Sequence, residues 1–161
     1  MIYKELNEMG IVEERLADIA EVIALVTRAE RDLATSKLLY DKDEEWAFIV
    51  AYQAMSRSAR ALVLSEGLRP KAARGRDAQK TVITVVGVIL GEQYKSVINK
   101  FDRMRRKYKS FLDEAERIIS RYEAGQAVKD AEEFTALVNG KIREKYSQMS
   151  LLNDVPQLVS R

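Results

Sequence analysis

Helix breakers are scarce in this sequence, where Pro70 and Pro156 are the only prolines among 161 residues. Proline lacks a backbone N–H and clashes with the preceding helical turn, so its absence elsewhere leaves long stretches free to be helical. A chain of this length can bury the core of one domain. The sequence therefore predicts an all-α fold, an antiparallel bundle of four to five helices in one domain over residues 1–146.

Two residue types are missing altogether, because the chain contains no cysteine and no histidine. Without cysteine it cannot form a disulfide, a thiolate nucleophile or a cysteine zinc site. Without histidine it cannot use a Ser–His triad, a histidine base or a histidine-bound metal. No spaced set of carboxylates indicates a Mg²⁺ or Ca²⁺ site. We therefore expect neither a metal nor a cofactor, and we assign no catalytic residue.

Neither a leader sequence nor a membrane span is indicated. The first ten residues, MIYKELNEMG, intersperse acids and lack the apolar core of a signal peptide. The longest apolar run, Val82 to Leu90, is far shorter than the ~20 residues that cross a bilayer. The sequence predicts a cytoplasmic protein that does not bind a membrane.

Apolar residues recur at helical spacing in the first part of the chain. Residues 11–40 are predicted to form one long amphipathic helix, and the segment before Gly10 a separate helical turn. The expected buried stripe comprises Leu16, Ile19, Ile23, Val26, Leu33 and Tyr40. Residues 43–66 are apolar almost all round and rich in small residues, which predicts the central helix of the bundle. Asp43 is placed to cap it.

Residues 76–90 are ambiguous, because the β-branched stretch TVITVV locally favours a strand. A strand without a partner would leave its backbone groups unpaired, so we predict a helix. A further helix over 93–112 is indicated by apolar residues at alternating spacings of four and three. Its seam comprises Val97, Phe101, Met104, Tyr108 and Phe111.

The last helix is predicted to begin at Ser120, which forms a capping box with Glu123. Its expected core positions are Ala127, Ala131, Phe134, Val138 and Ile142. Residues 147–161 lose the periodicity and are expected to be a loose tail or, alternatively, to dock on a partner.

Basic residues are concentrated in two segments although the net charge is only +2. Clustered cations bind phosphates through additive release of counterions. The alternative is a solvated face balanced by acids on neighbouring helices. Whether the two segments meet depends on the handedness of the bundle. The candidate contacts for RNA or a partner are Lys100, Arg103, Arg105, Arg106, Lys107 and Lys109 in the helix, and Arg69, Lys71, Arg74 and Arg76 in a loop.

Helical geometry divides the basic helix into two stripes. Lys100, Arg103 and Lys107 share one stripe, and Arg105 and Lys109 share another. On the central helix, Arg57 and Arg60 are expected to pair with acids or mark an interface, because buried charges need partners. Tyr108 lies on the apolar seam and is expected to be core, although exposed aromatics can stack on bases.

Two stretches resemble HEPN-domain proteins over about residues 19–145. The first is AERDLATSKLLYDKDEEWAFIVAYQAMSRSARALVLSEGLRP, which matches the opening two helices of the family. The second, MRRKYKSFLDEAERIISRYEAGQAVKDAEEF at 104–134, resembles the family's basic helix, acidic turn and final helix. The resemblance implies a helical bundle, usually a homodimer. Members are often encoded beside a minimal nucleotidyltransferase as toxin–antitoxin pairs.

Active members of that family resemble ribonucleases in which an Arg, commonly followed by Asn, precedes a His by four to six residues. The matching stretch here, Arg105 to Leu112, lacks both the Asn and the His. The same His belongs to the family's tyrosine-modification motif, so neither activity transfers. Only Arg105, Arg106 and Lys107 carry over, as RNA contacts.

These observations favour a non-catalytic HEPN-like dimer that binds a nucleotidyltransferase partner, RNA, or both. One alternative is a metal-independent ribonuclease that uses Arg and Tyr in place of the missing His, although an acid–base group contributes about 10²–10⁴-fold. The second alternative is a plain helical scaffold whose basic segments are ordinary surface.

Overall fold

Helices account for nearly all of the regular structure, as predicted. The computed structural model describes residues 3–153, with side chains described through residue 148. In chain order the elements are α1 (Lys4–Met9), β1 (Val12–Glu14), α2 (Ile19–Leu39), α3 (Glu44–Ser65), β2 (Leu68–Pro70), α4 (Ala78–Leu90), the 3₁₀ helix η1 (Glu92–Tyr94), α5 (Lys95–Asp113) and α6 (Arg121–Asn153).

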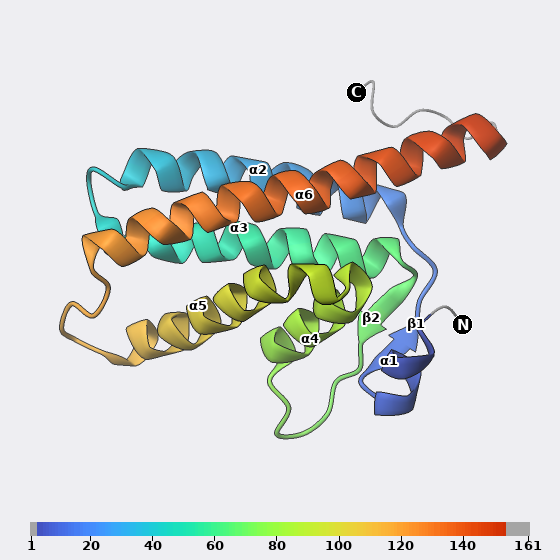
Figure 1. Cartoon of the computed structure of the whole chain (residues 1–161), viewed down its shortest axis with the longest axis horizontal. Helices are drawn as coiled ribbons and strands as arrows, with labels where there is room; N and C mark the ends of the chain where they lie inside the picture. Colours follow the sequence, from blue (N-terminus) through green and yellow to red (C-terminus); the bar gives the residue numbers. More distant parts are fainter. Residues whose placement is uncertain (1–2, 154–161) are drawn as a thin grey trace.

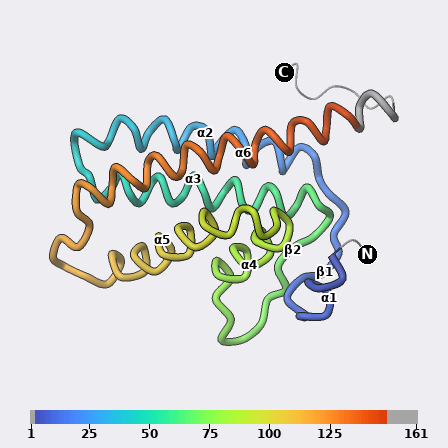
Figure 2. Tube along the Cα trace, viewed as in Figure 1, coloured from blue at the N-terminus to red at the C-terminus, as the bar shows by residue number. Residues whose placement is uncertain are grey.

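The helices form a bundle around α3 (Figure 1). α2 and α3 form an antiparallel hairpin, α6 packs against both of them, and α4 and α5 pack against α3. α5 and α6 run in opposite directions and contact each other only sparsely. The far end of α6 projects beyond the other long helices (Figure 2).

α3 is the central helix, as its composition predicts. Asp43 caps it by accepting a hydrogen bond from the Trp46 backbone N–H at 3.2 Å. Small side chains at Ala47, Ala51 and Ala54 are fully buried, which allows the neighbouring helices to approach closely.

α4 confirms the helical prediction for the β-branched segment. Asp77 caps it by accepting hydrogen bonds from the backbone N–H groups of Gln79 and Lys80. Val85 and Val86 are fully buried, so branched side chains that favour a strand locally instead fill the interior. A Cβ atom added at Gly87 would lie 3.5 Å from Ile98, which shows how closely α4 approaches α5.

The capping box at the start of α6 is confirmed. The Glu123 carboxylate accepts from the Ser120 backbone N–H at 3.3 Å, and the Ser120 hydroxyl accepts from the Glu123 N–H at 3.1 Å. The predicted core positions of this helix, Ala127, Ala131, Phe134, Val138 and Ile142, are all buried. Glu45 accepts from the backbone N–H groups of Ile118 and Ile119, so the connection before α6 is tied to α3.

The prediction of one helix over residues 11–40 is wrong for its first part. Val12–Glu14 form a strand that pairs antiparallel with Leu68–Pro70. Gly10 adopts a left-handed conformation that ends α1, and Asp18 caps α2. Leu16 was expected in the buried stripe but is 94% exposed, because it precedes the helix. The separate helical turn before Gly10 is confirmed as α1.

The loose tail predicted from residue 147 does not coincide with the end of α6. The helix runs through Asn153, so its first seven predicted tail positions continue the helix. The rest of that segment lies outside the described residues. Within residues 3–153, no helix combines the length and apolarity needed to cross a membrane.

Candidate functional site

The two basic stripes of α5 face different neighbours. Lys100 and Lys107 form ion pairs with acids of α6. Arg105 and Lys109 both pair with Asp77 at the start of α4. The helical register of α5 therefore divides its basic residues between an α6 side and an α4 side.

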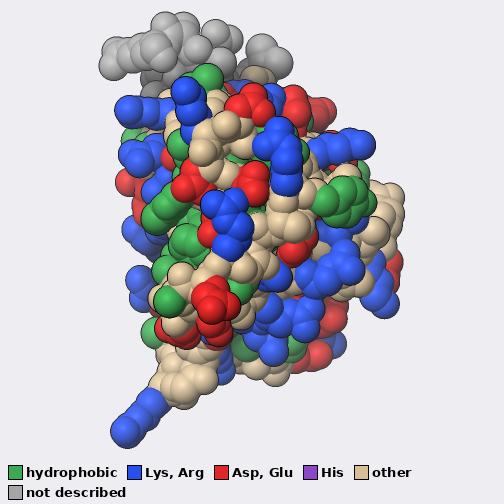
Figure 3. All heavy atoms as spheres, turned by 90° about the vertical axis from the view of Figure 1, so that its left-hand side faces the viewer, with side chains coloured by type: hydrophobic (Ala, Val, Ile, Leu, Met, Phe, Trp, Pro, Cys, Tyr) green, Lys and Arg blue, Asp and Glu red, His purple; other side chains and the backbone are tan. Residues whose placement is uncertain are grey.

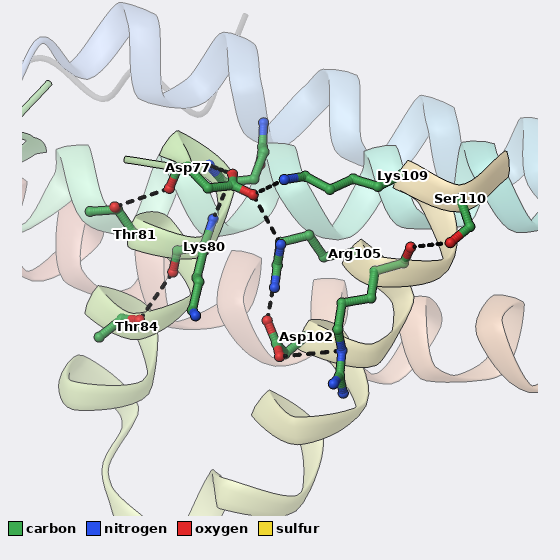
Figure 4. Close-up of polar contacts among 10 residues, drawn as sticks. Asp77, Lys80, Thr81, Thr84, Asp102, Arg105, Lys109 and Ser110 are labelled. Carbon is green, nitrogen blue, oxygen red and sulfur yellow. Dashed lines mark hydrogen bonds and ion pairs between the residues drawn. The ribbon is translucent and has the colours of Figure 1, made fainter. Parts of the chain in front are cut away.

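On the α4 side, Arg105 is engaged by two carboxylates (Figure 4). Its side chain is only 8% exposed. It donates to Asp77 at 2.9 Å and to Asp102 at 2.9 Å. Lys109 pairs with the same oxygen of Asp77. The hydrogen bond from Lys109 lowers the pKa of Asp77, against the opposing effect of burial. Arg105 and Asp77 thus join α5 to α4, and Arg105 has little surface left for a ligand.

Arg106 lies outside this network and is 63% exposed. Its only ion-pair contact among the described residues is a long one, 3.8 Å from Nε to Asp102. Surface pairs of this kind contribute about 0–1 kcal/mol to stability. Arg106 is therefore accessible to solvent.

On the α6 side, a groove of about 560 Å³ lies between α5 and α6. Phe48, Met104 and Ala127 are buried and provide an apolar floor. Tyr122 lines the groove and is 76% exposed. The charged and polar lining consists of Lys100, Arg103, Lys107, Glu123, Gln126 and Asp130.

The antiparallel register of α5 and α6 places an ion pair at each end of this groove. Lys107 lies 3.3 Å from Glu123, and Lys100 lies 3.6 Å from Asp130. Arg103 falls between these pairs in sequence, is exposed, and makes no ion pair within the part of the chain that is described. Arg103 therefore lies near the middle of the groove without a direct ion pair to a described acid, although its charge helps to lower the pKa of Asp130.

Asp130 is the most buried charged group of the groove, with 9% of the residue exposed. Burial raises the pKa of Asp130, and Lys100 acts in the opposite direction. The charged form of Asp130 is thus held against a desolvation cost mainly by Lys100, with a smaller contribution from the charge of Arg103.

The predicted basic loop carries little organised structure of its own. Arg69 lies on β2 and pairs with Glu13 across the strand pair. Arg76 donates to the Lys71 backbone carbonyl at 2.9 Å, and Lys71 and Arg74 are exposed. The loop and α5 meet at Asp77, the residue after the loop, which carries the opposite charge.

The charged residues of α3 behave differently from one another. Arg57 pairs with the buried Asp32 of α2, as expected. Arg60 is exposed, and no ion pair is formed by it among the described residues. Tyr108 packs with its ring centroid 4.8 Å from that of Tyr52 and is half-buried, so it belongs to the core as predicted.

Tyr122 was missed by sequence reasoning, which considered only aromatics near the basic segments. The available signal was the helical spacing of Tyr122, Gln126 and Asp130, which lie four residues apart on one face of α6. Residues of α6 become relevant only once they are known to face α5.

Charges of both signs alternate over the end of the bundle that carries the turn between α2 and α3 (Figure 3). There Arg121 pairs with Asp41 and lies 4.2 Å from the centroid of the Tyr40 ring. Within residues 3–148, no three His, Cys, Asp or Glu side chains converge as metal ligands would. Neither observation indicates a catalytic centre in the described part of the chain.

Comparison with protein families gives one match. A family model described as HEPN domain matches residues 22–142. No curated protein and no solved structure shows significant similarity to the chain.

Proposed function

The chain belongs to the HEPN-domain family, and from that premise we propose that it is a non-catalytic module that binds single-stranded RNA along the α6-facing side of α5. The family match covers α3, α4 and α5 completely and most of α2 and α6. It supports a role connected with nucleotides or RNA.

The observation that carries this proposal is the α5–α6 groove. Single-stranded nucleic acids are bound by cationic grooves that also offer aromatic rings for base stacking. Here Lys100, Arg103 and Lys107 supply the cations, and Tyr122 supplies an exposed ring. No other surface described above combines these features.

Two observations favour binding without cleavage. The chain has no histidine, so the acid–base group of the active members is missing. Arg105, at the start of the matching stretch, is buried and holds two carboxylates. An Arg in that position stabilises the fold and cannot readily turn toward a phosphate.

A second function, protein binding, is favoured by exposed apolar side chains at one end of the bundle. Trp46 is 51% exposed and packs edge-on against Phe111, while the adjacent Leu112 is 62% exposed. Exposed apolar clusters mark interaction surfaces. The resemblance offers two occupants, a second copy in a homodimer or a minimal nucleotidyltransferase of a toxin–antitoxin pair.

Fluorescence anisotropy with a labelled single-stranded RNA of about ten nucleotides tests the RNA proposal. We expect binding that weakens with salt, with a log–log slope of about −2 if three phosphates are contacted at ~0.7 each. The RNA should remain intact on a denaturing gel. Cleavage by the purified protein would overturn the non-catalytic assignment, and absence of binding at low salt would overturn RNA binding itself.

Light scattering tests protein association independently of RNA. A homodimer would have about twice the 18.4 kDa mass of one chain. Trp46→Ser should shift that mass toward the monomer if the exposed apolar cluster forms the contact.

A further inference from the structure

We propose that the α5–α6 groove holds a single unpaired RNA nucleotide, with its phosphate on Arg103 and its base stacked against Tyr122. This assignment rests on the proposed RNA-binding function and names the unit of RNA that the groove accepts. It also predicts discrimination between single strands and duplexes.

The position of Arg103 is the first argument. The other two cations of the groove are each paired with a carboxylate, Lys107 with Glu123 and Lys100 with Asp130. Arg103 makes no ion pair with any described acid and is exposed. An arginine fork that is not already engaged can bind phosphate oxygens in a bidentate manner.

The boundaries of the groove are the second argument. Ion pairs cross from α5 to α6 on either side of Arg103, at 3.3 Å for Lys107–Glu123 and 3.6 Å for Lys100–Asp130. The groove has a volume of about 560 Å³, within the roughly 300–1,000 Å³ typical of small-molecule sites. A short groove that is crossed by an ion pair on either side of Arg103 suits one nucleotide better than a long stretch of strand.

The third argument is the combination of ring, floor and amide. Tyr122 presents an exposed ring at the edge of the groove, and the buried Phe48 and Met104 form an apolar floor. A base can lie between such surfaces with its flat faces covered. The Gln126 amide, which also lines the groove, can both donate to and accept from a base edge.

Unpaired nucleotides meet these requirements and duplexes do not. In a duplex each base is stacked and paired, so its faces cannot reach Tyr122 without being extruded. An acidic peptide could occupy Arg103 but would make no use of the aromatic ring. The presence of both features favours RNA over a carboxylate-rich peptide.

Two substitutions test the assignment, each with a matched control. Arg103→Gln removes the proposed phosphate contact, and Arg31→Gln removes an exposed arginine of α2, outside the groove. Tyr122→Leu removes the ring, whereas Tyr122→Phe retains it. Thermal unfolding of every variant should match wild type, because Arg103 and Tyr122 are exposed.

Binding is measured by anisotropy with a single-stranded RNA, the same sequence as a duplex, and a polyglutamate peptide. We expect Arg103→Gln to weaken single-strand binding about tenfold and to make the salt slope shallower by ~0.7. Tyr122→Leu should weaken it about tenfold, while Tyr122→Phe and Arg31→Gln stay within about twofold. The duplex should bind more weakly than the single strand.

The outcomes separate this inference from the function on which it rests. If wild type binds RNA but neither Arg103→Gln nor Tyr122→Leu weakens it, the nucleotide site is wrong and RNA binding stands. If wild type binds no RNA, both fail. Equal affinity for polyglutamate, insensitive to Tyr122→Leu, would assign the groove to an acidic peptide instead.

Discussion

The guanidinium of Arg105 donates a hydrogen bond across 2.9 Å to the carboxylate of Asp77, joining α5 to the cap of α4. Its Nε donates to Asp102 as well, so the buried cation has a partner on each side. This arrangement explains why the most buried arginine of the basic helix is a structural residue. Breaking this pair removes the most buried donor from two partly buried carboxylates, and leaves Lys109 beside Asp77 and the more distant Arg106 beside Asp102.

Replacing Arg105 should therefore destabilise the fold. We expect Arg105→Met to lower the free energy of unfolding by about 2–4 kcal/mol, because two partly buried carboxylates lose their shared donor. Arg106→Met, one residue away but 63% exposed, should cost less than about 1 kcal/mol. Urea denaturation measures both. Equal costs for the two variants would contradict the assignment of Arg105 to the interior.

Asp77 should make stability depend on pH in the acidic range. Its pKa is lowered in the folded state, first by the hydrogen bond from Lys109, so its ionised form stabilises the fold above the unfolded pKa of about 3.9. That contribution is lost as the pH falls through the lower, folded-state pKa. Asp77→Asn retains a good capping residue. Its stability deficit should be full at neutral pH and should shrink below about pH 4.

Urea denaturation of Asp77→Asn and wild type across this pH range supplies the comparison. A deficit that stays constant from neutral to acidic pH would mean that the carboxylate charge contributes nothing. Any loss of stability of the wild-type protein at acidic pH would then have to come from other acidic residues.

Asp130 should act against ligand binding in the α5–α6 groove. Its carboxylate places a negative charge where the proposed phosphate approaches. Burial raises the pKa of this carboxyl group. Asp130→Asn should strengthen single-stranded RNA binding by about threefold to tenfold, because it removes local repulsion and frees Lys100. Anisotropy at low salt measures the change, and weaker binding would contradict the prediction.

Asp130→Asn should change the free energy of unfolding at neutral pH in the opposite direction to Asp77→Asn. A carboxyl whose folded pKa is raised disfavours folding when ionised, and this penalty disappears as the pH falls through the folded pKa. Asp130→Asn should consequently be at least as stable as wild type at neutral pH. Thermal unfolding checks this.

Glu123 takes part in both the cap of α6 and an ion pair across the groove, each through a different carboxylate oxygen. Oε1 accepts from the Ser120 backbone N–H, and Oε2 pairs with Lys107 across the groove. Ser120→Ala should cost about 1 kcal/mol through loss of the cap. Because both residues serve one capping box, Ser120→Ala and Glu123→Ala together should cost less than the sum of their separate effects. Additive losses in urea denaturation would contradict this coupling.

Sequence periodicity predicted the helices well where packing and local signals agree. Asp43, Ser120 and Glu123 mark helix starts by a local hydrogen-bond chemistry that the structure reproduces. The helical prediction for α4 succeeded because it weighed backbone pairing above the strand preference of single residues.

The failures share a non-local origin. Val12 to Glu14 pair with residues more than fifty positions away, and no local pattern reveals that partner. Leu16 continues the helical spacing in the sequence, but Asp18 starts the helix two residues later.

The candidate site was only partly foreseeable for the same reason. The division of α5 into two stripes follows from helical geometry, yet which charges are compensated depends on what each stripe faces. Arg103 and Arg105 are both arginines of the same basic helix, so the sequence does not distinguish them. Only the structure shows that Arg105 is bound by two carboxylates and that Arg103 is exposed.

The short β1–β2 ladder has a consequence for the order of folding. Strands of three residues cannot pair stably by themselves, and the chain between Glu14 and Leu68 would have to close a long loop at an entropic cost. The α2–α3 hairpin removes most of that cost, because folding it brings both ends of the intervening chain together. The two strands should therefore pair after the hairpin has formed, as a late step of folding on a bundle that has already collapsed.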